Sequence, residues 1–179
     1  DPEEARRLLA ESSYGGPDTL PPIFYTTQGA AEPGGIAIAM ADMWNENLGV
    51  VIQVFPLVRG SYFYNLEAQR EHLFDYGWIA DYPDPHNFLD VLFHSGATNN
   101  VGGYSNSEVD ALLELAREES GGQKRLEMYQ RAERMMVDDA AAIPLYFGRS
   151  QMLVKPYVND LVFTPFGMID LRSVSLSDR

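Results

Sequence analysis

The sequence has no cysteine and few basic residues. Without cysteine there can be no disulfides, thiol nucleophiles or thiolate metal sites. Lys and Arg number 13 against 26 Asp and Glu, which gives a formal net charge of −13, and no Lys/Arg-rich run occurs. A negative field of this size repels phosphate backbones and anionic lipid head groups, so nucleic acid is not an expected partner.

Long apolar runs are also missing. No stretch approaches the roughly 18 to 20 apolar residues that a membrane-spanning helix needs, and no signal-peptide pattern is visible. The chain opens instead on a capped helix, with Asp1 as N-cap, Pro2 at the first helical position and Glu4 completing a capping box. We therefore expect a trimmed form of a longer protein, with any leader absent from this sequence.

The residues that are present suit a globular protein. The chain has 179 residues, of which 45% are hydrophobic, 12% aromatic and 22% charged. This length fits one domain or one lobe of a larger protein, and the composition argues against disorder.

Helical and strand patterns alternate through the first three quarters of the chain. Helices are predicted over residues 1–14, 36–48, 61–66, 87–93, 105–120 and 126–140. Three of them have capping signals: Gly49 at the C-terminal end of 36–48, Ser61 at the start of 61–66, and a Ser105/Glu108 capping box at the start of 105–120. Strands are predicted over 20–27 (an edge strand or its approach, because of Pro21-Pro22), 50–55, 72–79, 143–147 and 151–154, the last two joined at Gly148. Residues 94–103 read as a surface loop, and the tail from Tyr157 as short β pieces separated by turns. This alternation indicates an α/β layered lobe.

Motifs for catalysis or metal binding are weak. His72, His86 and His94 lie apart along the chain without an HExxH-like pair, so we expect no bound metal. No GxSxG, SxxK, GxGxxG or P-loop motif occurs, and we expect no cofactor. Asp81 and Asp84 form a pair of carboxylates, which a hydrolase could use, but two aspartates around Pro83 are more typical of a turn.

The most informative segment is aromatic and acidic together. Trp78 follows Gly77 near the end of the predicted strand 72–79, and the rigid turn 81–85 comes next. Glycine in a strand often marks the close approach of a ligand or another backbone. A carboxylate just past a strand end lies where α/β sheets present ligands, so Asp81 could accept a charge-assisted hydrogen bond from an amine. The alternative, an aspartate that only shapes the turn, stays open at this point.

The segment from Gly77-Trp78 through 81–85 to Phe88-Leu89 belongs to a series of ordered blocks. The others lie within residues 1–11, 44–50, 99–113, 125–146 and 153–158. Together they resemble the oligopeptide- and dipeptide-binding family of ABC-importer solute-binding proteins, and the resemblance runs through nearly the whole chain.

The resemblance implies a type II periplasmic-binding-protein-like lobe, with a mixed sheet flanked by helices, in a protein that closes on its ligand through a hinge. Residues 1–161 would form the C-terminal, ligand-binding lobe, and 162–179 a tail that crosses back to an N-terminal lobe lying outside this chain. The implied partners are peptides or another small solute, the permease subunits of the importer and that N-terminal lobe. The implied location is extracytoplasmic, either periplasmic or lipid-anchored at the outer face of the cytoplasmic membrane.

The same resemblance implies roles for individual residues. Asp81 would pair with the α-amino group of a peptide, and the backbone from Gly77 to Ile79 would pair with the extended ligand as an added strand. Trp78 would form the wall of a side-chain pocket. The remaining implied ligand-binding residues are Tyr82, Asn99, Asn100, Asp75 and Arg59.

Asp75 departs from the family pattern. It stands where relatives often have an apolar or basic residue, and a basic residue there can hold a peptide carboxylate. An acidic residue argues against such capture or favours a cationic ligand.

The resemblance implies a non-enzymatic binding protein, and three alternatives remain. The same fold could bind an oligosaccharide, an opine or a metal chelate. The chain could be a carboxylate-based hydrolase, or a sensor or chaperone lobe.

Overall fold

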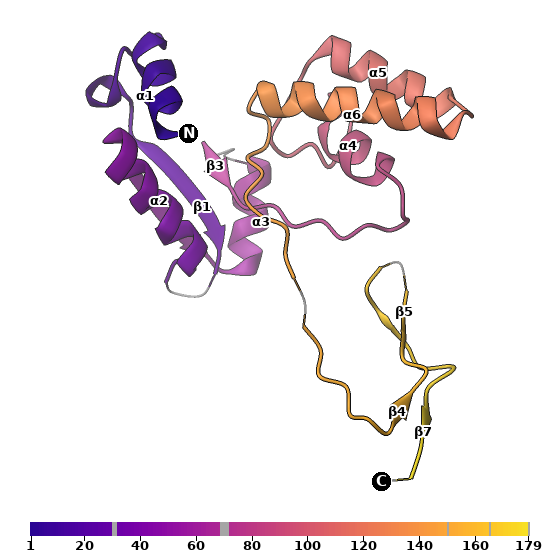
Figure 1. Cartoon of the computed structure of the whole chain (residues 1–179). Coiled ribbons are helices and arrows are strands. Elements are labelled where there is room, and N and C mark those ends of the chain that lie inside the picture. The colour runs from indigo at the N-terminus through magenta and orange to yellow at the C-terminus, as the bar shows by residue number, and fades with distance from the viewer. Residues whose placement is uncertain (30–31, 69–71, 150, 165, 179) are drawn as a thin grey trace. The chain divides into compact units, whose positions relative to one another are not determined.

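The computed structural model describes residues 1–29, 32–68, 72–149, 151–164 and 166–178. The chain separates into two compact units, Asp1–Gly77 and Trp78–Arg179 (Figure 1). Among the described residues, every helix is too short or too polar to span a bilayer.

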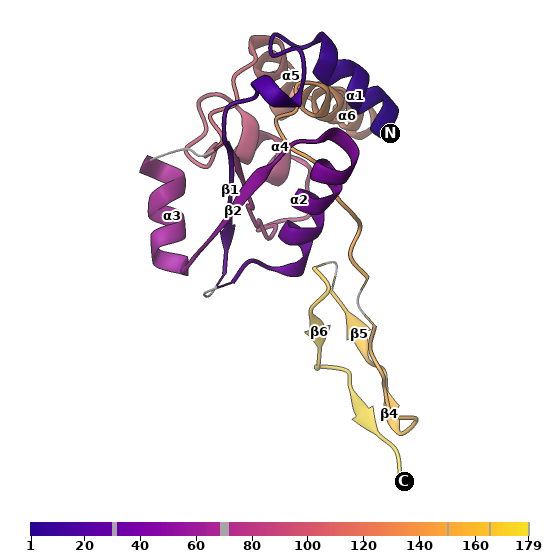
Figure 2. The ribbon, with the colours of Figure 1, turned by 90° about the vertical axis from the view of Figure 1, so that its left-hand side faces the viewer.

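The first unit is built on a parallel three-stranded sheet in the order β2 (Ile52–Leu57), β1 (Ile23–Gln28), β3 (Leu73–Phe74). Its helices α2 (Gly35–Leu48) and α3 (Arg59–Ala68) lie on opposite sides of β1 in both views (Figures 1 and 2). The α/β class is therefore confirmed, and the described strands of this sheet all run in one direction. The elements before β1 are α1 (Pro2–Glu11) and the 3₁₀ helix η1 (Pro17–Thr19).

The core of this unit joins helix α2 to the sheet. Tyr25, Ala37, Val50 and Ile52 are buried together, and Leu9 of α1 packs against them. The start of α1 is the predicted one, because Asp1 accepts hydrogen bonds from the backbone N–H groups of Glu3 and Glu4, both at 3.1 Å.

Helix α2 ends as predicted at Gly49. This residue adopts the left-handed conformation, with φ of 70°, and its N–H donates to the carbonyl of Asn45 at 3.0 Å. A Cβ atom there would meet only Pro17 carbons at 3.5 Å or more, which is an ordinary contact, so the cost of a side chain lies in the backbone.

We expect Gly49→Ala to lower the free energy of unfolding of the first unit by about 1 kcal/mol. Urea unfolding followed by Trp44 fluorescence in a Trp78→Phe background measures it. Gly60→Ala is the matched control, because Gly60 is helical and its Cβ would enter open space. Equal losses for both variants would contradict the role of the left-handed cap.

The second unit contains three helices and a β-ribbon. The helices are α4 (His86–Phe93), α5 (Ser107–Glu118) and α6 (Gly122–Asp138), and α5 and α6 lie side by side (Figures 1 and 2). Their buried core consists of Val109, Leu113, Ala116, Tyr129, Ala132 and Met136, with Leu89 and Phe93 of α4 against it. In the ribbon, β4 (Val158–Asn159) pairs antiparallel with β7 (Ser175–Leu176), and β5 (Val162–Phe163) with β6 (Ile169–Asp170). The short β pieces predicted for the tail are thus confirmed.

Three helix starts differ from the prediction, and one of them is that of α6, which begins at Gly122 and not at residue 126. Ser61 lies inside α3, because the helix begins earlier and Tyr62 N–H already donates to Val58 O at 2.9 Å. Asn106, and not Ser105, caps α5, since its side-chain oxygen accepts from Glu108 N at 3.0 Å and Val109 N at 3.4 Å. At both α3 and α5, the residue at which the helix starts depends on the path of the loop before it.

The strand predictions needed more correction. The prolines precede β1, which occupies the centre of the sheet and not its edge, and β2 begins at Ile52 and not at residue 50. Of the strand predicted over 72–79, only β3 forms, which is two residues long, so Gly77 to Ile79 belong to no strand.

The strands predicted over 143–147 and 151–154 are wrong. These residues have no partner strand among the described residues, and Phe147 and Leu153 are fully exposed. Ser150 lies outside the described residues.

Candidate ligand-binding site

Asn87 organises the segment that the sequence singled out. It lies in the first turn of α4 with a side chain only 1% exposed. Its Oδ1 accepts hydrogen bonds from the indole Nε1–H of Trp78 at 2.8 Å and from the backbone N–H of Asp81 at 3.0 Å. Its Nδ2 donates to Asp81 Oδ2 at 3.3 Å. One buried amide thereby fixes both Trp78 and Asp81.

The Asp81 side chain is exposed while one carboxylate oxygen is held by Asn87. Among the described residues no Lys, Arg or His forms an ion pair with it. A carboxylate that is oriented by the protein, accessible to solvent and not neutralised can accept a strong hydrogen bond from an ammonium group.

Asp84 has a different environment from Asp81. It receives a bidentate contact from Arg125, at 2.7 and 2.9 Å, and accepts from His86 N at 2.9 Å. The hydrogen bonds from Arg125 hold the pKa of the Asp84 carboxyl below its usual range, against the opposing effect of partial burial. An ionised, ion-paired carboxylate is a poor proton donor, so the pair Asp81 and Asp84 gives a hydrolase little support.

Arg125 connects this turn to the helices. Its Nε donates to the carbonyl of Ala116 at 3.0 Å, and its guanidinium lies over the Tyr129 ring at 4.9 Å from the centroid. Asp84 in the turn, the end of α5 and the core tyrosine of α6 are therefore tied together by one side chain.

The histidines have separate partners. The Tyr82 hydroxyl lies 2.6 Å from His86 Nδ1, and His86 Nε2 lies 3.7 Å from Asp90, which is buried and bidentate to Arg117 at 2.7 Å. His72 accepts from Phe24 N at 3.2 Å, and His94 faces Glu114 at 3.3 Å. Among the described residues no three metal-binding side chains gather.

Asn99 and Asn100 lie in the predicted loop 94–103, and their side chains differ in availability. Asn100 is buried, and its amide bonds to the backbone of His94 at 3.2 Å and of Tyr104 at 2.7 and 3.1 Å. Asn99 is half-buried beside it. Asn100 therefore shapes the loop.

The predicted site residues fall into two groups, one in each unit. Arg59, Asp75 and Gly77 belong to the first unit, and Trp78, Ile79, Asp81, Tyr82, Asn99 and Asn100 to the second. In the first unit Asp75 accepts a hydrogen bond from the Tyr25 hydroxyl, and Arg59 lies over the Phe63 ring at 5.6 Å. In the second unit Ile79 is 88% exposed. Trp78 and Asp81 are brought together through Asn87.

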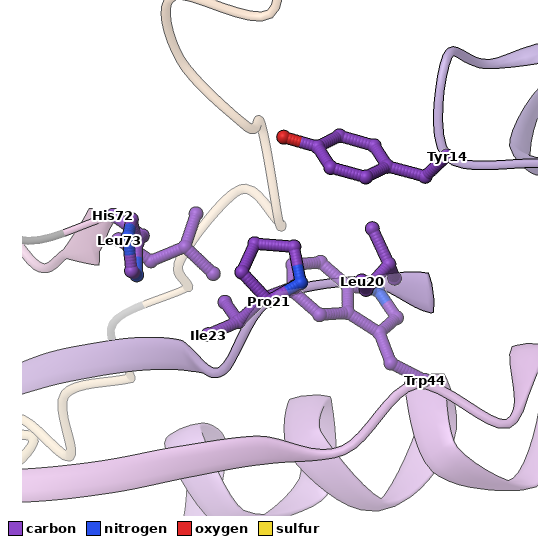
Figure 3. A pocket seen from close by; sticks show the side chains of 7 residues that line it. All are labelled: Tyr14, Leu20, Pro21, Ile23, Trp44, His72 and Leu73. Atoms are coloured by element: carbon purple, nitrogen blue, oxygen red, sulfur yellow. The ribbon is translucent and has the colours of Figure 1, made fainter. Parts of the chain in front are cut away.

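An apolar hollow of about 340 Å³ lies elsewhere in the first unit (Figure 3). Its lining consists of Leu20, Pro21 and Ile23 around the start of β1, Leu73 of β3, and Tyr14, Trp44 and His72. It is thus at the amino end of the strands, whereas ligands of parallel α/β sheets bind at the carboxyl end.

Sequence reasoning missed Asn87 and Arg125 as residues that shape the site. From the sequence, Asn87 is predicted only to start a helix. The available signal was chemical: a partly buried Trp78 needs an acceptor for its indole N–H, and a short polar side chain after the turn 81–85 can supply one.

Known proteins of one family resemble this chain in sequence. Residues 1–100, more than half of the chain, match the family model described as bacterial extracellular solute-binding proteins, family 5 middle. The periplasmic oligopeptide-binding protein OppA of Salmonella typhimurium is 32% identical over 160 residues, covering 87% of this chain and 28% of that protein. The dipeptide-binding protein DppE of Bacillus subtilis is 29% identical over 173 residues, 94% of this chain and 31% of that protein.

Solved structures of peptide-binding proteins have a similar fold. The crystal structure of Haemophilus influenzae OppA in complex with RPPGFSPFR is 26% identical and superposes with a TM-score of 0.75, covering 88% of this chain and 31% of that one. The unliganded open form of MppA, a periplasmic murein tripeptide-binding protein, is 27% identical, with a TM-score of 0.71 over 78% of this chain and 27% of that one.

The fold is that of type II periplasmic binding proteins, as predicted. The chain belongs to family 5 of the bacterial extracellular solute-binding proteins. It spans somewhat under a third of the length of these curated relatives.

Proposed function

We propose that this chain is part of the substrate-binding component of an ABC importer, and that Asp81 binds the α-amino group of a peptide. The observation that carries the proposal is the exposed Asp81 carboxylate, oriented by the buried Asn87. Several relatives are named for oligopeptide, dipeptide or murein peptide binding, which supports a peptide as the ligand.

The proposal extends to the rest of the implied site and its setting. Trp78 and Tyr82 flank the amine position, Gly77 to Ile79 offer backbone groups to an extended peptide, and Asn99 belongs to the lining loop. Arg59 and Asp75, which the family resemblance also implies as ligand-binding residues, belong to the first unit. Residues 1–161 act as one lobe, the tail 162–179 reaches the other, and the loaded protein delivers its ligand outside the cytoplasm to the permease without chemical conversion.

Asp81→Asn is the decisive variant, because it keeps the shape and the contact to Asn87 but removes the charge. In a family-length protein that contains this chain, we expect free-amine peptides to bind at least about tenfold more tightly than their N-acetylated forms. Asp81→Asn should abolish that difference in isothermal titration.

Asp138→Asn is the matched control, since it removes the same charge from an exposed position at the end of α6. It should leave the preference for a free amine unchanged. Equal binding of free and acetylated peptides by the unmodified protein would refute the role of Asp81. Binding of a sugar or another solute in place of peptides would support the same fold with a different ligand.

A further inference from the structure

A second acidic site lies at the carboxyl end of the sheet in the first unit. Asp75 directly follows β3, and its N–H donates to Thr26 O of β1 at 3.3 Å. The Tyr25 hydroxyl of β1 donates to the Asp75 carboxylate. Asp75 is nevertheless exposed to solvent. Its carboxylate is therefore oriented and accessible at the edge where parallel sheets present ligands.

Two buried hydroxyl groups near this edge lack a partner. Tyr62 of α3 and Thr27 of β1 are each only 2% exposed, and neither side-chain oxygen has a hydrogen-bond partner among the described residues. Helix α3, which carries Tyr62, packs against β1, the strand whose Tyr25 binds Asp75. Burial, followed by the negative charge of Asp75, raises the pKa of the Tyr62 hydroxyl. Leaving a buried hydroxyl unsatisfied costs free energy that a ligand donor can recover.

The cluster formed by Asp75, Tyr25 and Tyr62 carries only negative charge. In the described part of the chain no cation forms an ion pair with Asp75. Arg59, one turn before Tyr62 on α3, is held over the Phe63 ring. Such a cluster repels a carboxylate and suits a group that carries positive charge and several N–H donors.

We propose that Asp75, Tyr25 and Tyr62 form a subsite for a cationic side chain of the bound ligand, an arginine guanidinium or a lysine ammonium. The subsite rests on the proposed function, because it assigns a preference to a peptide that the protein binds. Asp75 supplies the charge, Tyr25 orients it, and the Tyr62 oxygen accepts a further hydrogen bond from the ligand.

The test uses peptides that differ in one side chain. A family-length protein that contains this chain is titrated with a free-amine peptide carrying arginine, citrulline or glutamate at each of the first four positions in turn. Citrulline has the shape of arginine without its charge. We expect arginine to exceed citrulline by roughly tenfold at one position, and glutamate to bind more weakly than citrulline there.

Three variants separate the subsite from a structural role. Asp75→Asn keeps an acceptor for Tyr25 and should remove the arginine preference, with citrulline binding unchanged. Tyr62→Phe removes a hydroxyl that has no partner, so its thermal stability should be equal or higher, while the arginine preference falls several-fold. Asp138→Asn again controls for net charge.

The outcomes distinguish this proposal from the one on which it rests. Equal affinity for arginine and citrulline at all four positions, with the free-amine preference intact, would overturn the cationic subsite alone. An arginine preference that survives in both Asp75→Asn and Tyr62→Phe would overturn it as well. If none of the peptides binds, peptide binding itself fails and the subsite fails with it.

Discussion

Asn87→Ala should lower the free energy of unfolding of the second unit by about 3 kcal/mol and remove the preference for a free peptide amine. The side chain is almost fully buried and makes three hydrogen bonds, to the Trp78 indole and to the backbone and carboxylate of Asp81. Its loss deprives two N–H groups of their shared acceptor, leaves a cavity and releases Asp81 from its fixed orientation.

Stability is measured by urea unfolding in a Trp44→Phe background, where Trp78 is the one remaining tryptophan. Binding is measured as the affinity ratio of free to N-acetylated peptide, which a general loss of stability would not change. Asn106→Ala is the matched control, because it removes the cap of α5 in the same unit at a cost of about 1 kcal/mol and touches neither Trp78 nor Asp81. If Asn87→Ala kept the ratio, Asn87 would not position Asp81.

Arg125→Ala should lower the free energy of unfolding of the same unit by about 2 kcal/mol at pH 7. The substitution removes the bidentate contact to Asp84, the hydrogen bond to Ala116 O and the stacking on Tyr129. Because both partners are largely shielded, with side-chain exposures of 26% and 31%, their attraction is screened less than that of a surface pair.

The effect of Arg125→Ala should depend on pH in a defined direction. Arg125 lowers the folded-state pKa of Asp84, so the stabilisation is fully present above the unfolded value of about 3.9 and is lost as the pH falls through the lower, folded pKa. The difference between wild type and variant should therefore be constant from pH 7 to 5 and shrink below pH 4.

Arg131→Ala is the control for this series. Its pair with Glu108 is 57% and 62% exposed, and we expect its loss to cost less than about 0.5 kcal/mol. A wild-type-to-variant difference for Arg125 that stayed the same at pH 3 would show that the ion pair with Asp84 does not carry the effect.

The best sequence predictions concerned local structure. Asp1 caps α1 and Gly49 ends α2 because capping involves groups within a few residues of each other along the chain. The turn at 81–85 was predicted for the same reason, since Pro83 and Pro85 restrict the backbone wherever the segment lies. Helix α4 began within one residue of the predicted start.

Predictions that required a partner strand failed. Residues 143–147 and 151–154 have strand composition but no neighbouring strand among the described residues, and a strand exists only in a ladder. β3 stops after two residues although the apolar pattern continues, because its pairing with β1 ends there. Whether a segment belongs to a sheet is decided by what lies beside it.

The amino-acid sequence alone determined the α/β class, the acidic character of the protein, the turn that carries Asp81 and the family resemblance on which the proposed role of Asp81 rests. Each of these depends on composition, on residues close together in the chain, or on the order of short motifs along it. Only the tertiary structure decided that Asn87 holds Trp78 and Asp81, that Arg125 engages Asp84, and that Tyr25 donates to Asp75. Tyr25 and Asp75 are 50 positions apart, and Asp84 and Arg125 are 41 apart. Such contacts form because folding buries polar groups that must then find partners, and the sequence gives no direct sign of which partner lies nearest.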